Sequence, residues 1–487
     1  ASIKDAGIKH AVLLGMGGSS LAPEVYQRTF GNAAGYPEMI VLDSTHPTAV
    51  RAVERRIDPL RTLFLVSSKS GTTTETLSYF YYFWKLVSDR SKQPGQNFVA
   101  ITDPGTPLEK LARERKFRRV FSAPPEVGGR YAALTVFGLV PAALIGMDLK
   151  RLLDEAWTMA EASAFCVGSQ KCPSLALGAA MGELARMQRD KITFLASPSL
   201  AAFPIWVEQL IAESTGKDNK GIVPIADEPV GAPDVYDKDR FFVLMHIPGE
   251  NKDLEARVAA LEQAGHPLAR IALQDKYDLG QEFFRWEMAV ASAAAVLGIQ
   301  PFNQPDVQLA KDLAKKAMEG KAGGQQAPEV AASQRQQLQS ALQEWLGRAQ
   351  AGNYICLQAY LEPTSETDAA LEQLRVLLRD KSRLATTAGY GPRFLHSTGQ
   401  LHKGGPNTGL FLQLVDQAAT DVPVPETNYT FGQLIRAQAQ GDWQALTQRG
   451  RRVVRVQLGS NAQGGLAQLL EVASELRSEL NSGHRAA

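Results

Sequence analysis

The sequence is poor in the residues that mark several classes of protein. Only three of its 487 residues are cysteine and seven are histidine, so we predict neither a disulfide framework nor a metal site. The cysteines, Cys166, Cys172 and Cys356, favour a reducing compartment, and we expect a cytoplasmic location. The net charge is only +1, which argues against nucleic acid or an anionic membrane as the main partner.

Long apolar runs are also missing. The longest extends from Ala132 to Met147 and is interrupted by Thr135 and Pro141, so we interpret it as buried helix and expect no membrane span. It overlaps a stretch, 134–164, that we expect to be one long helical region. Hydrophobic residues make up 44% and charged residues 21% of the chain, which is typical of a globular protein with enough length for two or three cores.

Short apolar runs alternate with helical patterns along most of the chain. This alternation predicts an α/β fold, with parallel sheets covered by helices on both faces. We predict two doubly wound domains, at 1–147 and 148–319, an exposed linker rich in Ala, Gly and Gln at 320–334, and a C-terminal α/β extension at 335–487. The predicted strands of the two domains are 10–14, 39–42, 63–66, 98–101, 120–121, 192–196, 241–245 and 271–273.

The strand at 63–66 leads into SSKSGTTTET, residues 67–76. Backbone N–H groups at a helix start favour an anion, and the hydroxyl groups add further donors. The segment therefore predicts a phosphate-binding loop. A polar loop before a Ser/Thr-capped helix explains the same pattern equally well.

A second glycine-rich turn, GMGGSS at 15–20, follows the first predicted strand. It does not fit the dinucleotide-binding pattern, because Ser20 stands where the third glycine should be. The glycines favour close approach of the backbone to a small ligand, although a plain tight turn remains an alternative. Both loops follow neighbouring strands, and open α/β sheets bind ligands at that edge.

Two residues stand out near the end of an apolar helix, in QLIAESTGK at 209–217. Gln209 and Glu213 are four positions apart and share one helix face. The negative end of the helix dipole should raise the pKa of Glu213 and make it a better base. An ion pair with Lys217 is the simpler alternative.

Arg130 follows two glycines and precedes an apolar helix. Because a guanidinium keeps its proton, it could stabilise a developing oxyanion in a cleft. Many such arginines only bind a neighbouring loop.

The remaining candidates are a lysine and two histidines. Lys311 opens a helix that also carries Lys315 and Lys316, so it could simply belong to a solvated basic face. His396 and His402 lie in a dense polar loop, too far from other ligand types for a convincing metal site. Proton transfer suits them better.

Five motifs in order resemble those of glucose-6-phosphate isomerases, which are built from two sugar-isomerase (SIS) domains. The resemblance covers 11 to about 316. A further segment, GYGPRFLHSTGQLHKGGP at 389–406, is similar to the isomerase half of transaldolase/glucose-6-phosphate isomerase fusions, which implies a transaldolase part before Ala1. The five motifs are GMGGSS, SSKSGTTTET, VGGRYA, QLIAESTGKDNKGI and WEMAVA followed by PFNQPDVQLAK.

The resemblance also implies roles for individual residues. Glu213 would be the proton-shuttling base, Arg130 would stabilise an enediolate, and Gln209 would line the site. Lys311 and His396 would open the sugar ring. The substrate would be held by its phosphate at Ser68, Lys69, Ser70 and Thr73, with Gly18 and Ser19 approaching the sugar.

The chain departs from this family in one respect. Most members carry the histidine between the glutamate and the lysine, whereas His396 follows Lys311 here. In the family, the partner chain of a dimer donates the histidine, so we expect a possible homodimer. The rearrangement could change which chain donates His396, and it leaves His402 as an alternative.

The activity implied by the resemblance is interconversion of glucose 6-phosphate and fructose 6-phosphate through a cis-enediol. It needs a small sugar phosphate and neither a metal nor an organic cofactor, because one carboxylate can serve both carbons. A non-catalytic SIS-domain sensor is the main alternative, but it would not need Glu213, Arg130 and Lys311 together. A nicotinamide-dependent oxidoreductase is disfavoured by the incomplete glycine pattern.

Overall fold

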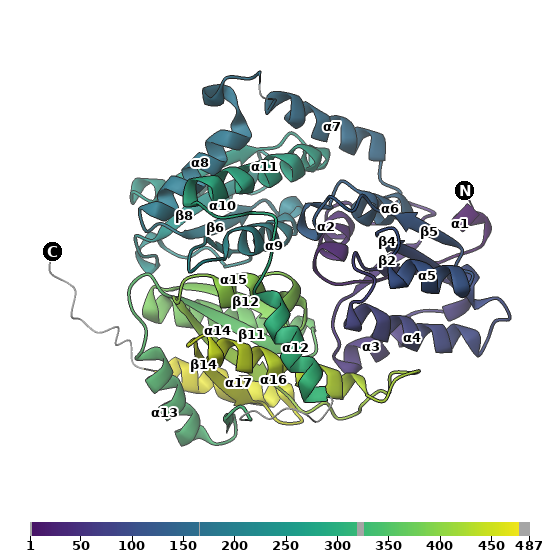
Figure 1. Cartoon of the computed structure of the whole chain (residues 1–487). Helices are drawn as coiled ribbons and strands as arrows, with labels where there is room; N and C mark the ends of the chain where they lie inside the picture. The colour runs from purple at the N-terminus through teal and green to yellow at the C-terminus, as the bar shows by residue number, and fades with distance from the viewer. Residues whose placement is uncertain (1, 165, 319–325, 477–487) are drawn as a thin grey trace.

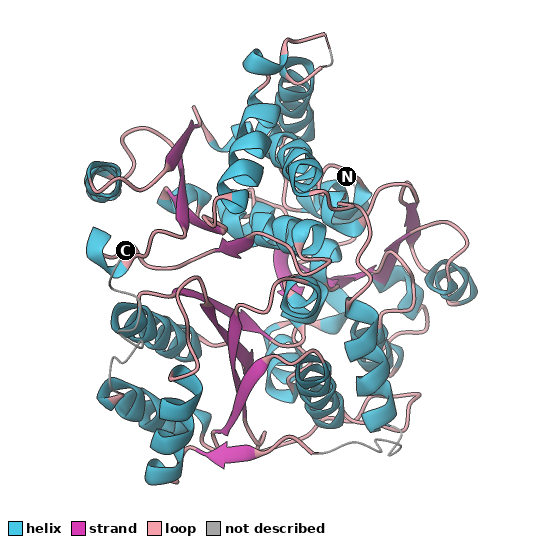
Figure 2. Cartoon of the chain, turned by 60° about the vertical axis from the view of Figure 1, so that its left-hand side comes forward, coloured by secondary structure: helices cyan, strands magenta, loops and turns pink. Residues whose placement is uncertain are grey.

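Three parallel β-sheets organise the molecule, and each belongs to its own lobe (Figure 1). The computed structural model describes residues 2–164, 166–318 and 326–476. The strand orders are β2-β1-β3-β4-β5, β7-β6-β8-β9 and β10-β14-β13-β11-β12. Figure 2 shows helices on both faces of the sheets, so the predicted α/β class, with two doubly wound parallel sheets and a further C-terminal α/β lobe, is confirmed.

The strands match the predicted apolar runs closely in the first lobe. In the second lobe the strand expected at 271–273 lies at 268–272, and the short strand at 223–225 was not predicted. The first sheet contains β1 (His10–Leu14), β2 (Glu38–Leu42), β3 (Thr62–Ser67), β4 (Phe98–Thr102) and β5 (Arg119–Ser122). The second contains β6 (Lys191–Ala196), β7 (Val223–Ile225), β8 (Arg240–His246) and β9 (Leu268–Ala272). The third contains β10 (Glu329–Ala331), β11 (Tyr354–Tyr360), β12 (Ala385–Tyr390), β13 (Gly409–Val415) and β14 (Arg452–Gln457).

The helices connect these strands and cover the sheets. Those of the first half are α1 (Ser2–Asp5), α2 (Leu21–Phe30), α3 (Pro47–Arg56), α4 (Thr74–Ser88), α5 (Pro107–Glu114), α6 (Val136–Leu144), α7 (Leu149–Ala162) and α8 (Pro173–Arg186). The remaining ones are α9 (Phe203–Thr215), α10 (Lys252–Gln263), α11 (Leu279–Leu297), α12 (Val307–Met318), α13 (Arg335–Leu346), α14 (Ser365–Ser382), α15 (Gly399–Gly404), α16 (Phe431–Gln448) and α17 (Ala462–Glu475).

Two predicted segments differ from the structure. The single helical region expected at 134–164 is two helices, because Gly146 adopts φ +86° and Asp148 then caps α7 through the N–H of Arg151. Of the linker expected at 320–334, residues 320–325 lie outside the described residues. The rest contains β10, which pairs with β14 as an edge strand. Its Ala-rich and polar composition concealed this strand.

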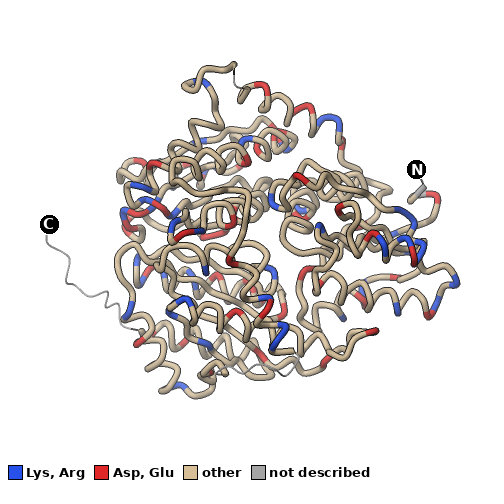
Figure 3. The backbone as a smooth tube through the Cα atoms, in the orientation of Figure 1, with Lys and Arg blue, Asp and Glu red and all other residues tan. Residues whose placement is uncertain are grey.

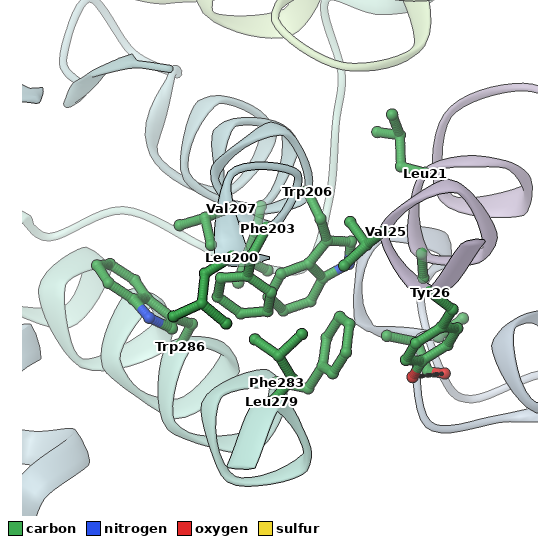
Figure 4. Packing of buried hydrophobic residues seen from close by; sticks show 14 of the residues in the cluster. Leu21, Val25, Tyr26, Leu200, Phe203, Trp206, Val207, Leu279, Phe283 and Trp286 are labelled. Carbon is green, nitrogen blue, oxygen red and sulfur yellow. Dashed lines mark hydrogen bonds between the residues drawn. The ribbon is translucent and has the colours of Figure 1, made fainter. Parts of the chain in front are cut away.

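The second lobe packs around the aromatic side chains of α9 and α11. Phe203 and Trp206 meet Phe283, with ring centroids 5.1 and 4.6 Å apart (Figure 4). The same apolar cluster extends to Leu21 and Tyr26 of α2. The first two lobes therefore share one continuous core, which fixes the position of α9 between them.

The surface carries mixed charge. Basic and acidic residues are interspersed along the chain in Figure 3, in keeping with the net charge of +1. In the described part of the chain, none of the helices combines the length and apolarity required to span a membrane.

A buried ion pair of the second lobe is hydrogen-bonded to the third lobe. Arg240 Nη1 lies 3.0 Å from Glu228 Oε2, and both side chains are completely buried. Glu228 also accepts a hydrogen bond of 2.7 Å from the Thr386 hydroxyl. Nearby, Arg375 donates to the backbone carbonyl of Asp227 at 2.9 Å. The lobes are therefore tied by polar contacts that water cannot replace.

Replacing Glu228 by alanine should lower the free energy of unfolding by about 3–5 kcal/mol, because it leaves Arg240 charged and unpaired in the interior. Denaturant unfolding measures this change. Glu183→Ala breaks a surface pair with Arg186 and should cost under about 1 kcal/mol. Equal losses for the two variants would contradict the inference.

Candidate active site

The end of α9 delivers a carboxylate into the interior. Glu213 lies in the last turn of this helix and is 7% exposed, and its neighbours on α9 are buried too. Burial raises the pKa of Glu213 to about 7, against the opposing charges of Arg130 and Lys311. The sequence suggested the helix dipole as the cause of a raised pKa, but burial is the larger one.

Arg130 is the cation closest to this carboxylate. It belongs to the short 3₁₀ helix η4 (Gly129–Tyr131), is 2% exposed, and its Nη1 lies 3.4 Å from Glu213 Oε2. Its Nε donates to the Ser214 hydroxyl at 2.8 Å. Nη1 also donates to Gln304 Oε1 at 2.9 Å, and Nη2 to the Asn303 carbonyl at 3.2 Å. The guanidinium thus binds a neighbouring loop and faces Glu213 at the same time.

Lys217, the alternative partner of Glu213, is engaged elsewhere. Its amine donates to the carbonyl of Gln300 and, at 3.1 Å, to Oδ1 of Asn303. Burial lowers the pKa of Lys217 to about 8. Lys217 and Arg130 therefore hold the same loop, and this leaves Arg130 beside the carboxylate.

Three loop backbones meet at the glycine-rich turn after β1. A Cβ atom at Gly18 would lie 2.1 Å from the carbonyl oxygen of Gly129, and one at Gly17 would lie 2.5 Å from that of His396. Gln209 Nε2 donates to the same His396 carbonyl at 2.8 Å and lies 3.5 Å from Glu213 Oε2. The glycines were expected to admit a ligand. In the structure, Gly17 and Gly18 allow the backbones of His396 and Gly129 to approach this turn closely.

His396 comes from the third lobe, at the end of the short 3₁₀ helix η9 (Arg393–His396). Its Nε2 lies 2.9 Å from Oε1 of Glu75, which is on the first turn of α4. Although burial acts in the opposite sense, the charge and hydrogen bond of His396, with the charge of Lys311, hold the pKa of Glu75 below its usual value. A single chain thus brings His396, Gln209 and Glu213 together.

Sequence reasoning missed Glu75, although its motif SSKSGTTTET was singled out for the hydroxyl groups. Its signal was an acidic residue on the first turn of a helix of otherwise apolar and aromatic character. It also missed Gln304 and Ser214, which bind Arg130. These residues carry no distinctive pattern of their own.

His402 lies apart from the site, in the core of the third lobe. Its Nε2 is 3.5 Å from Cys356 Sγ, and its Nδ1 is 3.4 Å from the Gln358 amide. Burial holds the pKa of His402 well below its usual value. The two histidines of the polar loop therefore occupy very different surroundings.

Lys311 lies on the exposed side of α12, which packs beside α16 (Figure 1). Its positive charge nevertheless acts on both Glu213 and Glu75. Lys311 can therefore lie on a solvated helix face and still act on the charges of Glu213 and Glu75.

The hydroxyl-rich loop at 68–73 precedes α4. The hydroxyl groups of Ser68 and Thr73 are 2.8 Å apart, and those of Ser70 and Thr72 are 3.0 Å apart. Lys69 points elsewhere, because its amine lies 2.5 Å from Asp103 Oδ2. Phosphate binding at this loop would therefore involve hydroxyl and N–H groups rather than the Lys69 amine.

The predicted Ser19 connects this loop to the glycine-rich turn. Its backbone carbonyl accepts a hydrogen bond of 3.2 Å from the Ser67 hydroxyl, and the residue itself is buried. Through Glu75, the helix that follows the loop also contacts His396. The loop is thus tied to the site at both ends.

A separate cavity of about 820 Å³ lies between the second and third lobes, with α2 of the first lobe contributing to its lining. Arg393 of η9 lines this cavity, but neither Glu213 nor Arg130 does. The charged lining includes Glu208 and Arg375. Within the described residues, no group of three or more His, Cys, Asp and Glu side chains could hold a metal ion.

Fold and site together define a class of protein. A buried carboxyl group with a pKa of about 7 can accept and return a proton near neutral pH. A fixed guanidinium beside it can stabilise an oxyanion. Together with two doubly wound parallel sheets, these features describe an α/β protein with a candidate acid–base site between two of its lobes. A solved structure of a hypothetical protein from Thermus thermophilus has the same fold, with a TM-score of 0.58, 26% identity, and coverage of 65% of this chain and 85% of that one.

Sequence comparison narrows the class. The family model for phosphoglucose isomerase matches residues 3–232. A glucose-6-phosphate isomerase of Thermus thermophilus is 29% identical, over 64% of this chain and 84% of the relative. One of Rubrobacter xylanophilus is 29% identical, over 63% of this chain and 82% of the relative. Over these residues the chain is similar to phosphoglucose isomerases.

A glucose-6-phosphate isomerase structure from Chlamydia trachomatis shares the fold at a TM-score of 0.58 and 19% identity. It covers 66% of this chain and 72% of that one.

The raised pKa of Glu213 makes a prediction about stability. Because the folded protein holds this proton more tightly than the unfolded chain, folding becomes less favourable as the pH rises from about 4.5 to about 7. Glu213→Gln removes that cost. Relative to wild type, the variant should gain roughly 2 kcal/mol of stability between pH 5 and pH 8. Denaturant unfolding at both pH values measures the gain, and a pH-independent difference would contradict it.

Proposed function

We propose that the protein is an aldose–ketose isomerase that interconverts D-glucose 6-phosphate and D-fructose 6-phosphate. The observation that carries this proposal is the buried Glu213 carboxylate, with a pKa of about 7, 3.4 Å from Arg130. Such a pair suits proton transfer next to a carbonyl group. The names of the relatives support the substrate.

Ring opening is the first step of the proposed mechanism. The sugar binds as a closed ring, and Lys311 and His396 move a proton from the anomeric hydroxyl to the ring oxygen. The contact between His396 and Glu75 supports this role, because it fixes one ring nitrogen and leaves the other for the substrate. The result is an open-chain aldose.

Proton transfer between carbons follows. Glu213 removes the proton from C2, a cis-enediol forms, and the same carboxylate returns the proton to C1. Arg130 stabilises the negative oxygen that develops in between. One carboxylate can serve both carbons, so we propose that the reaction uses no metal and no organic cofactor.

Substrate binding is assigned to the two loops of the first lobe. We propose that Ser68, Ser70 and Thr73, with the backbone of Lys69, hold the phosphate at the start of α4, where N–H groups favour an anion. Gln209 lines the site, and the turn containing Gly18 and Ser19 borders the sugar. Binding at the phosphate then orients the reacting carbons.

The site is proposed to be complete within one chain. His396 contacts Glu75 and Gln209 of its own chain, so catalysis does not require a histidine from a partner. A homodimer, a cytoplasmic location and fusion to a transaldolase remain proposals. For the last, the support is the segment at 389–406. The domain boundaries at 1–147, 148–319, 320–334 and 335–487 are likewise proposed.

A coupled assay with glucose 6-phosphate tests the function. Wild type should form fructose 6-phosphate, with kcat/KM falling as the pH drops below about 7, because the base must be ionised. Glu213→Gln should lose at least about 100-fold in activity, since positioned acid–base groups contribute about 10²–10⁴-fold. Activity of the variant within about tenfold of wild type would refute the assignment. Binding without turnover by wild type would favour the sensor.

His396 and His402 should behave differently. His396→Ala should turn over cyclic glucose 6-phosphate slowly but still exchange the C1 proton of an open-chain substrate, because Glu213 and Arg130 are intact. His402→Ala should keep the wild-type ratio of these two rates, whatever it loses in stability. A lowered ratio for His402→Ala alone would move the role to His402.

The same variants test whether one chain supplies the whole site. Mixing His396→Ala with Glu213→Gln should leave the mixture inactive if each chain carries its own site. Recovery of activity on mixing would instead mean that the histidine comes from a partner subunit.

A further inference from the structure

A glutamine of the third lobe contacts the carboxylate that holds His396. Gln438, on α16, donates from Nε2 to Oε1 of Glu75 at 2.6 Å. This is the same oxygen that lies 2.9 Å from Nε2 of His396. Gln438 and Glu75 are each 5% exposed, so water is not the partner that satisfies this carboxylate.

The amide of Gln438 is itself held from the other side. Thr45, in the loop between β2 and α3, donates its hydroxyl to Gln438 Oε1 at 2.9 Å and is completely buried. With its oxygen engaged by Thr45, the amide presents its NH₂ group to Glu75. A chain of hydrogen bonds therefore runs from Thr45 through Gln438 and Glu75 to His396.

We propose that Gln438 is a positioning residue for ring opening: its amide keeps the Glu75 carboxylate ionised and in place, so that this carboxylate holds the proton on Nε2 of His396 and leaves Nδ1 to exchange a proton with the sugar. The inference rests on the proposed isomerase function. It assigns to α16 a part in the reaction although Gln438 touches no reacting atom.

Physical chemistry supports this direction of effect. A donor to the ionised form of a carboxyl group lowers its pKa, and loss of that donor raises it. A protonated Glu75 would offer an O–H group to Nε2 of His396 and so move the imidazole proton to Nδ1. Nδ1 of His396 would then already carry a proton and could not accept one from the sugar, so ring opening would slow.

Other ionisable groups also surround Glu75. His396 and Lys311 lower its pKa by their positive charge. Tyr79 on α4 and Tyr429 before α16 face it as well, and the Glu75 charge contributes to raising the pKa of each phenol. Because both phenols stay neutral at working pH, neither adds a charge that would change with pH beside Glu75.

Two substitutions should alter the reaction with opposite pH dependence. Gln438→Leu removes the donor, so the midpoint of Glu75 titration should rise. The ratio of cyclic-substrate turnover to open-chain proton exchange cancels the titration of Glu213. In Gln438→Leu, this ratio should fall below that of wild type as the pH is lowered, by up to about tenfold for each unit by which the midpoint shifts, and recover as the pH rises.

Gln438→Glu should show the reverse. When protonated, the new carboxyl group can donate to Glu75 as the amide does, whereas above the pH at which the pair loses its shared proton, two carboxylates repel each other. Its ratio should therefore be close to wild type at low pH and fall as the pH rises. The matched control is Gln444→Leu, on the same helix and 8% exposed, which should leave the ratio unchanged.

Carbon-13 NMR titration of the glutamate carboxyl groups, with thermal unfolding of each variant, completes the experiment. A shifted Glu75 midpoint in Gln438→Leu and opposite pH trends in the two variants support the proposal. The proposal would be overturned if both Gln438 variants kept the wild-type ratio of cyclic-substrate turnover to open-chain exchange at every pH. It would also be overturned if this ratio fell equally at every pH together with a lower Tm. If wild type forms no fructose 6-phosphate, the proposed function fails, while the NMR midpoint still decides whether Gln438 controls Glu75.

Discussion

The structure depends on how the buried charge of Arg130 is neutralised and hydrogen-bonded. A guanidinium that is 2% exposed needs acceptors from protein on several sides. The end of α9 supplies Glu213 and Ser214, and the loop before α12 supplies Gln304 and two backbone carbonyls. The first lobe contributes the arginine and the second lobe contributes all of these acceptors, so a site between the lobes follows from satisfying one charge.

The same burial creates reactivity and instability together. Removing Glu213 from water raises its pKa into the range useful for a base, and it makes the ionised form costly to bury. The shared apolar core around Trp206 and Phe283 holds α9 firmly enough to bear this cost. The packed core thus allows α9 to hold the ionised Glu213 carboxylate at its buried end.

Much of the fold could be predicted from the sequence, because apolar runs and helical periods are local signals. The strands of the first sheet agree with the predicted runs to within about one residue at most ends. The short edge strand β10 could not be predicted, because its pairing with β14 depends on residues more than a hundred positions away. The break between α6 and α7 rests on one glycine at positive φ, which a helical pattern conceals.

The site shows the same division. Gln209 and Glu213 share a helix face, and Arg130 follows a glycine pair, so local patterns were sufficient to select them. The partners of these residues were not predictable, because Glu75, Gln304 and Gln438 meet the site only through tertiary structure. The direction of the Lys69 amine toward Asp103 is a further example, since a lysine in a hydroxyl-rich loop gives no indication of where its side chain will point.

The supply of His396 by the third lobe also has a consequence for folding. Its contact with Glu75 spans 321 positions of the chain, which makes it a contact of very high sequence separation and costly in loop-closure entropy. In the third sheet, β14 lies between β10 and β13, so this sheet is finished only when the strand at 452–457 is in place. We therefore expect the contact between His396 and Glu75 to form late in folding, so that a partly folded chain with the first two lobes in place would bring Glu213 and Arg130 together without His396.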